Sequence, residues 1–250
     1  MEAVPFERVL GGDVGRAMMG VHEAKGVRFL MQATVARYLV TNGRVSGVAV
    51  KLADGVREIP ASVVVLGVGI VPATELLTPQ LPRHADGSVS TDEWLQASDG
   101  LFVGGDIARF PLRHGGEVNE VRVEHWAMAQ EHGRVAACNM LRAHSRSASA
   151  VVPFFWTSQY TKSLRYAGYS TDHDQVVIRG DLSITDASKL RFAAFYVRRS
   201  IVLAVATFNL DPLCAAAADC FKLCHDRPIT LQFMGEWFAQ HGISSVHAKI

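Results

Sequence analysis

The 250-residue sequence has little cysteine, no surplus charge and no long apolar run, and each shortage excludes a class of protein. Four cysteines are too few for the disulfide framework of a small secreted protein. The 25 basic and 24 acidic side chains leave no basic surplus for a nucleic-acid backbone. The most apolar segment, 61–73, contains two glycines and a proline and is shorter than the roughly 20 residues of a membrane helix. We therefore expect a reducing intracellular compartment, no nucleic-acid partner and no membrane span.

Signatures of metal sites and of catalytic side chains are also missing. Cys220 and Cys224 have helical spacing, but no second cysteine pair completes a zinc site, so free cysteines are expected. Histidines without partner spacing are expected on the solvated surface, namely His22, His84, His114, His132 and His144. The sequence therefore predicts no metal ligand and no catalytic residue.

The glycine fingerprint of dinucleotide-binding folds, G-x-G-x-x-G between a strand and a helix, does not occur either. The glycines of 11–15 have the wrong spacing, and Gly67-Val68-Gly69 continues into Ile-Val-Pro, which cannot open the required helix. No helix that would bind a pyrophosphate can therefore be assigned.

The first part of the chain nevertheless has clear secondary-structure patterns. Apolar spacing predicts a helix from Val14 to Gly26. Asn42-Gly43 and Asp54-Gly55 are turn sequences that separate strands of a β-meander. The strands are expected at 27–30, 34–40, 45–52 and 56–59. The apolar segment 61–72 that follows is typical of a strand buried on both faces of a parallel sheet.

The second part of the chain begins with another apolar strand, and its pattern of strands and helices changes after residue 150. A buried strand at 100–106 is followed by a Gly-rich loop, a helix over about 121–144 and a Ser/Ala-rich linker at 144–150. Beyond the linker, strands are expected at 176–179, 190–197 and 201–208, and helices at 211–224 and 229–241. These last elements predict an α+β domain.

The most informative local sequence is Gly104-Gly105-Asp106 at the end of the second buried strand. Glycines allow a backbone to approach a ligand closely, and a carboxylate just beyond them can accept hydrogen bonds from ligand hydroxyls. An ordinary turn that closes a strand explains the tripeptide equally well.

The wider sequence resembles a known family. Residues 99–108 resemble the second flavin motif of pyridine nucleotide-disulfide oxidoreductase-like flavoproteins, and 122–140 resemble the helix that follows it in the apoptosis-inducing-factor and ferredoxin-reductase group. Residues 151–159 resemble the segment that enters the C-terminal domain beside the flavin. The segments 162–169 and 68–74 are similar to the apoptosis-inducing-factor-like branch that carries a Rieske domain.

This resemblance implies an α/β fold with incomplete FAD- and NAD(P)-binding Rossmann-type domains and a C-terminal α+β domain. The implied boundaries are 1–78 for the remaining half of the NAD(P) domain, 79–150 for the returning half of the FAD domain, and 151–250 for the reductase-type domain. The implied cofactor-binding residues are Gly67, Gly69, Gly104, Gly105, Asp106, Glu124, His125, Trp126, Phe155 and Trp156. Asp106 would bind the ribityl chain, and Glu124 and His125 would contact the polar edges of nicotinamide or flavin, with an exposed helix face as the alternative for these two. The tryptophans would border the flavin ring, with a core position as the alternative for each.

The function implied is that of an FAD-dependent NAD(P)H oxidoreductase, with FAD and NAD(P)H as cofactors and an iron–sulfur protein, quinone or oxygen as acceptor. The alternative is a truncated, non-catalytic interaction or structural module. The choice between NADH and NADPH stays open, as does the choice between a mitochondrial and a cytoplasmic location.

Overall fold

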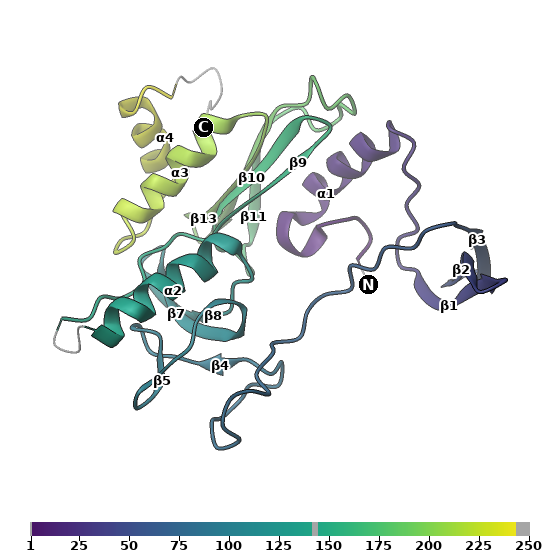
Figure 1. Cartoon of the computed structure of the whole chain (residues 1–250). Helices are drawn as coiled ribbons and strands as arrows, with labels where there is room; N and C mark the ends of the chain where they lie inside the picture. The colour runs from purple at the N-terminus through teal and green to yellow at the C-terminus, as the bar shows by residue number, and fades with distance from the viewer. Residues whose placement is uncertain (1, 142–144, 244–250) are drawn as a thin grey trace. The chain divides into compact units, whose positions relative to one another are not determined.

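The computed structural model describes residues 2–141 and 145–243, which form two compact units (Figure 1). The first unit comprises residues 1–70 and 183–186, and the second comprises 71–182 and 187–250, apart from the residues that are not described. Among the described residues, no helix is long and apolar enough to cross a membrane. The predicted boundaries at 78 and 150 are not tested by this division and stay predictions.

The first unit contains a helix and a small antiparallel sheet. Helix α1 (Glu7–Glu23) begins earlier than predicted, because a further helical turn precedes Gly11, whose φ of 79° and ψ of 164° interrupt the helix. The sheet consists of β1 (Thr34–Thr41), β2 (Arg44–Leu52) and β3 (Gly55–Pro60), in that order. This confirms the meander from 34 onward, whereas the strand expected at 27–30 is not formed.

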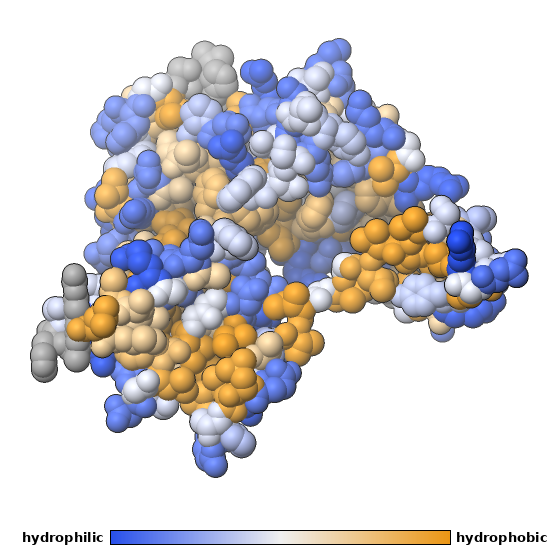
Figure 2. Space-filling model, viewed as in Figure 1, coloured by the Kyte–Doolittle hydropathy of each residue, from blue (hydrophilic) through white to orange (hydrophobic). Residues whose placement is uncertain are grey.

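The buried strand expected at 61–72 is a clear correction, because this segment forms no strand and most of its side chains are exposed. Val65, for example, is 87% exposed. A strand that is buried on both faces needs neighbouring strands for its backbone hydrogen bonds, and this segment belongs to none of the sheets of the described structure. Its first residue, Ala61, donates its N–H to the Ser46 carbonyl at 3.1 Å. Hydrophobic surface also gathers over the β1–β3 sheet (Figure 2).

The first part of the second unit is built from short strands around one long helix. Strands β4 (Val89–Ser90), β5 (Gln96–Ser98) and β6 (Leu101–Phe102) lead to the single-turn helix η1 (Gly105–Ile107). The predicted strand at 100–106 is thus only two residues long. Where a loop was expected, β7 (Ala108–His114) and β8 (Glu117–Val121) form a hairpin, whose sequence contains Pro111 and lacks strict alternation. Helix α2 (Trp126–Leu141) follows, and the end predicted at 144 lies outside the described residues.

The remainder of the second unit is a five-stranded antiparallel sheet with two helices on one face (Figure 1). The strand order is β11-β12-β13-β10-β9. The strands span β9 (Phe154–Gln159), β10 (Lys162–Gly168), β11 (Gln175–Gly180), β12 (Phe192–Arg198) and β13 (Ile201–Phe208). The three expected strands are confirmed, but β9 and β10 were missed because polar residues interrupt their apolar pattern.

Two helices cover one face of this sheet and form a hydrophobic core with it. Helix α3 (Asp211–Leu223) has Pro212 in its first turn, as expected, and α4 (Leu231–Gln240) is capped by the Thr230 hydroxyl, which accepts from the Phe233 N–H at 3.2 Å. Helix α3 packs on β10, β13 and α4, and the core that they form with the sheet includes Phe195, Val205, Leu213, Phe221, Met234 and Phe238. Burial of these side chains stabilises the sheet by roughly 1.5–3 kcal/mol per large side chain.

The segment 145–150 has no helix or strand, as expected of a linker, but it is tied to the rest of the unit. Asn139, which is buried on α2, donates to the carbonyls of Ser147 and Trp94, each at 3.0 Å, and accepts from the Ser147 N–H at 2.9 Å. Arg146 donates to Gln96 Oε1 at 2.6 Å. Because these bonds hold the backbone around Arg146, we expect it to resist proteolysis in the intact protein.

We predict that Asn139→Ala exposes this segment. The substitution removes the hydrogen bonds to the partly buried backbone groups of Trp94 and Ser147, which costs about 1 kcal/mol of local stability. Trypsin cleavage after Arg146, followed by mass spectrometry, should become several-fold faster than in the wild type. Gln130→Ala, on the exposed side of the same helix, is the control and should not change the rate. Equal rates for all three proteins would show that Asn139 does not hold the segment.

Candidate functional site

The Gly104-Gly105 turn lies against helix α2. A Cβ atom at position 104 would lie 2.9 Å from the Cβ of His132, closer than such atoms approach in proteins. Gly105 has a φ of +74°, which glycine tolerates far better than other residues, and a Cβ there would lie 3.4 Å from the Cβ of Ala129. Contact with the helix therefore accounts for both glycines, and their contact with a cofactor stays a prediction.

Asp106 begins the turn of η1 with its carboxylate exposed to solvent. Its backbone carbonyl accepts from Arg122 Nη1 at 3.1 Å, whereas no group in the described part of the chain donates a hydrogen bond to its carboxylate. The carboxylate is thus available as an acceptor for ligand hydroxyl groups, the role that the resemblance implies.

Glu124 and His125 lie in the extended segment between β8 and α2. The Glu124 carboxylate is 2.6 Å from Arg122 Nη1, which makes it part of an ion pair. The Nδ1 atom of His125 is buried and has no hydrogen-bond partner among the described residues. Burial lowers the pKa of His125, and the nearby carboxylates of Asp106 and Glu124 oppose that shift. A neutral imidazole with an unused nitrogen can accept or donate one hydrogen bond to a ligand.

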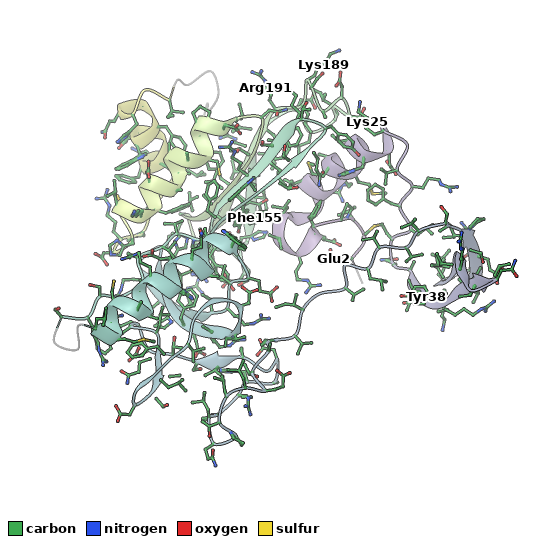
Figure 3. The ribbon with its side chains drawn as sticks, in the orientation of Figure 1. Glu2, Lys25, Tyr38, Phe155, Lys189 and Arg191 are labelled. Atoms are coloured by element: carbon green, nitrogen blue, oxygen red, sulfur yellow. The ribbon has the colours of Figure 1, made fainter. Side chains whose placement is uncertain are left out.

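The aromatic residue Phe155 connects this segment to the five-stranded sheet. Its ring lies edge-on to that of His125, with 5.3 Å between centroids, and stacks on Tyr166 at 5.0 Å. Figure 3 shows Phe155 beside the first turn of α2. Neighbouring residues of a strand point to opposite faces, so Trp156 lies on the other face of β9 from Phe155, together with Phe154, whose ring centroid is 6.3 Å from its own.

The two tryptophans predicted to border a flavin are exposed rather than buried in the core. Trp126 is 77% exposed at the start of α2, and Trp156 is 59% exposed on β9. The alternative assignment of both residues to the core is therefore wrong. Their exposed indoles are free to stack on a planar ring, and their contact with a flavin stays a prediction.

Gly67 and Gly69 lie in the first unit, within the exposed segment 61–70. A Cβ atom at either position would meet no atom within 4 Å. The fold therefore does not explain why glycine occurs here, and a role in cofactor binding stays a prediction.

Three charged residues of this region were not predicted as parts of the site. Asp86, Arg109 and Arg122 form a network in which the Asp86 carboxylate lies 3.0 Å from Arg109 Nη2 and 3.1 Å from Arg122 Nε. The sequence signal is weak, because no motif surrounds Asp86, and an arginine alone does not show which carboxylate it meets.

Two histidines expected on the surface are buried. His114 Nε2 makes a hydrogen bond to the Leu203 carbonyl at 2.5 Å, and burial lowers its pKa. His132 accepts the Gly105 N–H at 3.1 Å through Nδ1, and its ring lies edge-on to Phe110 at 4.5 Å. Burial lowers the pKa of His132 to about 4, opposed by the charge of Glu131. His144 lies outside the described residues.

The family comparisons agree with this geometry. The family model described as pyridine nucleotide-disulphide oxidoreductase matches residues 2–133, more than half of the chain, and the model described as reductase C-terminal matches 154–222. The chain therefore belongs to the pyridine nucleotide-disulphide oxidoreductase family. Its α/β fold class, with a C-terminal reductase domain, is confirmed.

Individual relatives are consistent with this assignment. The mouse and human proteins named apoptosis-inducing factor 3 are each 39% identical over 223 residues, which cover 88% of this chain and 35% of the relative. Putidaredoxin reductase CamA of Pseudomonas putida is 31% identical over 206 residues, with 82% and 46% coverage. The structure of a covalent putidaredoxin reductase–putidaredoxin complex matches with a TM-score of 0.80 and 26% identity over 97% of this chain and 57% of that chain. The chain thus spans about a third to a half of the curated relatives it matches.

The residues present fit the ribityl and ring portions of FAD, the cofactor that the family implies. The unoccupied acceptor of Asp106, the unpartnered Nδ1 of His125 and the exposed tryptophans are the groups that a polyol and a planar ring require. No described group of three or more His, Cys, Asp or Glu residues could hold a metal ion.

We predict that His132 makes stability depend on pH. Because its pKa in the folded protein is about 4, below the ordinary 6.5, the unfolded state binds more protons between these values. The free energy of unfolding should therefore fall as the pH drops from about 6.5 to 4.

His132→Asn tests this expectation. Asn can still accept the Gly105 N–H, but it does not titrate in this range. Urea unfolding at several pH values should show a pH-dependent loss of stability that is smaller in the variant, by at most about 3 kcal/mol. Identical pH slopes for both proteins would show that His132 is not buried in its neutral form.

Proposed function

We propose that this chain provides the ribityl- and ring-binding part of an FAD-dependent NAD(P)H oxidoreductase. The observation that carries the proposal is the grouping of an unengaged carboxylate, Asp106, with the unpartnered imidazole of His125, whose pKa responds to that carboxylate. Family membership supports the proposal, because it makes a flavin and a nicotinamide dinucleotide the expected ligands.

Each side chain has a binding role in this proposal. Asp106 accepts a hydrogen bond from a ribityl hydroxyl, and His125 contacts a polar edge of the ring. Trp126 and Trp156 cover the ring and exclude water. The bound flavin supplies the redox chemistry, taking hydride from NAD(P)H and passing electrons on singly. Because hydride transfer needs no protein nucleophile, the absence of a predicted catalytic residue agrees with this function.

The acceptor that we propose is an iron–sulfur protein. Relatives are named putidaredoxin reductase, rhodocoxin reductase and ferredoxin–NAD(+) reductase component, which supports this acceptor over a quinone or oxygen. The four free cysteines support a reducing compartment, either cytoplasmic or mitochondrial.

A non-catalytic interaction module is the second candidate. It is favoured by the exposed apolar segment 61–70 and by the exposed strands β1 and β3, because exposed apolar surfaces of this kind commonly bind another polypeptide. Flavin binding separates the two candidates, since an interaction module does not need an acceptor at Asp106.

We predict weak, reversible flavin binding by this chain. Because no pyrophosphate-binding fingerprint occurs in the sequence, the protein should lose FAD on desalting and should bind riboflavin about as tightly as FAD in equilibrium dialysis. Asp106→Ala should weaken both by about tenfold, the effect of one charge-assisted hydrogen bond.

Asp99→Ala is the matched control, because Asp99 is an exposed carboxylate seven residues earlier. It should leave both affinities unchanged. Failure of the wild-type chain to bind either flavin would contradict the proposed function and favour the interaction module. Equal effects of the two substitutions would remove Asp106 from the site.

We further predict that Trp156→Ala changes the environment of bound riboflavin more than its affinity. Removal of an exposed indole that covers the ring admits water, so the quenching of riboflavin fluorescence by the protein should decrease. Trp94→Ala, at a tryptophan far from β9 in the sequence, provides the spectroscopic comparison. Unchanged quenching in Trp156→Ala would show that this side chain does not cover the flavin.

A further inference from the structure

A shared carboxylate, Asp86, links two segments of the candidate flavin site. Asp86 lies in the loop before β4, outside every motif that implied a ligand contact. Its Oδ1 atom accepts from the N–H and the hydroxyl of Ser88, at 3.0 and 2.5 Å. Its Oδ2 atom accepts from Arg109 Nη2 at 3.0 Å and from Arg122 Nε at 3.1 Å. The hydrogen bonds from Ser88, and then that from Arg109, hold the pKa of Asp86 well below its usual range, so the group stays charged.

The guanidinium of Arg122 extends this link toward the site. Its side chain is only 17% exposed. Besides Asp86, it contacts the backbone carbonyl of Asp106 at 3.1 Å and the carboxylate of Glu124 at 2.6 Å, both through Nη1. One planar group therefore connects the turn of η1 with the segment that precedes α2.

We propose that Asp86 is a positioning residue of the flavin site, which acts by orienting Arg122 so that Asp106 and Glu124 are held together. This inference rests on the proposed function, because Asp86 can position the site only if Asp106 binds a flavin. Asp86 itself contacts no ligand in this arrangement.

The physical basis is the geometry of the guanidinium group. The orientation of a planar guanidinium is fixed only when acceptors bind donors on two of its edges. In Arg122, the Asp86 carboxylate binds Nε, and the Asp106 carbonyl and the Glu124 carboxylate bind Nη1. Without the carboxylate, Arg122 is free to rotate. Arg109 and Arg122 also lose the anion that separates their positive charges, and like charges in partly buried positions repel.

The position of the Asp106 backbone matters for binding because hydrogen bonds weaken steeply with misplacement. A carboxylate that must meet a ribityl hydroxyl has to be held within about 0.5 Å of the productive position. Its side chain has no partner in the described part of the protein, so the bond from Arg122 to the Asp106 carbonyl and the packing of η1 on α2 are the restraints available to it.

Asp86→Asn tests the proposal with little change in shape. The amide oxygen can replace Oδ1 and keep the two bonds from Ser88, whereas the amide nitrogen replaces Oδ2 and cannot accept from either arginine. The turn is preserved while the link to Arg122 is broken. Asp92→Asn is the matched control, because Asp92 accepts the backbone N–H groups of Trp94 and Gln96 within a loop of the same unit and contacts no arginine.

Three measurements on the full chain decide the outcome. Riboflavin affinity from equilibrium dialysis should fall about tenfold in Asp86→Asn and less than twofold in Asp92→Asn. The visible circular dichroism of bound riboflavin should change only in Asp86→Asn. Hydrogen–deuterium exchange should increase at 105–107 and 122–126 in Asp86→Asn, whereas both variants should keep the wild-type melting temperature within a few degrees.

Each contrary result has a distinct meaning. If the wild-type chain binds riboflavin, and Asp86→Asn binds it with the same affinity and the same visible circular dichroism, the positioning role is wrong. Unchanged exchange at 105–107 and 122–126 would overturn the proposed link even if affinity fell. If the wild-type chain bound no flavin, the proposed function itself would be wrong, and the positioning role would fall with it.

A second variant keeps the test decisive if Asp86→Asn does not fold. Arg122→Lys retains the positive charge, but a single ammonium group cannot reach Asp86, Asp106 and Glu124 in the same geometry. The same loss of affinity and the same increase in exchange are expected, and wild-type values for both would overturn the proposal. Arg134→Lys, an exposed ion-paired arginine on α2, is its control.

Discussion

The close approach of helix α2 to the Gly104-Gly105 turn is the constraint on which the candidate site depends. With glycine at both positions, the turn can lie against His132 and Ala129 of the helix. A methyl group at Gly104 would push the helix away by several tenths of an ångström, because it would overlap the Cβ of His132. The approach brings Asp106, just beyond the turn, into the same neighbourhood as the segment that precedes the helix.

Burial and charge then determine the chemical state of the groups near the contact. His132 is neutral because its ring is desolvated beneath the turn, and its Nδ1 atom can therefore accept the Gly105 N–H. Asp86 is charged because four donors surround it. On the solvent side, the Asp106 carboxylate and the indoles of Trp126 and Trp156 are exposed. On the interior side, the buried His125 Nδ1 and His132 Nε2 atoms have no hydrogen-bond partner among the described residues. Exposed aromatic rings beside a few polar groups are what a polyol and a planar ring can contact.

The two units differ in how completely they bury their apolar residues. The five-stranded sheet has helices α3 and α4 on one face and a continuous core. The β1–β3 sheet and the segment 61–70 leave large apolar side chains in solvent. A parallel strand gains its stability from neighbours on both sides, whereas an antiparallel meander forms from local turns. For this reason the same chain forms its hairpins and not its predicted parallel strand.

The sequence by itself determined the local elements and the chemical identity of the site. Some features depend only on neighbouring residues and can therefore be predicted from the sequence. Examples are the turn at Asn42-Gly43, the helix start at Asp211-Pro212 and the motif around Asp106. Only the tertiary structure decided that Trp126 and Trp156 are exposed, that His114 and His132 are buried, and that Asp86 reaches Arg122 across 36 residues. Burial and partners depend on contacts between distant segments, and no periodicity along the chain encodes which cation will meet a given carboxylate. The segment 61–70 shows the same limit, because its composition specifies a buried strand while burial itself requires neighbours.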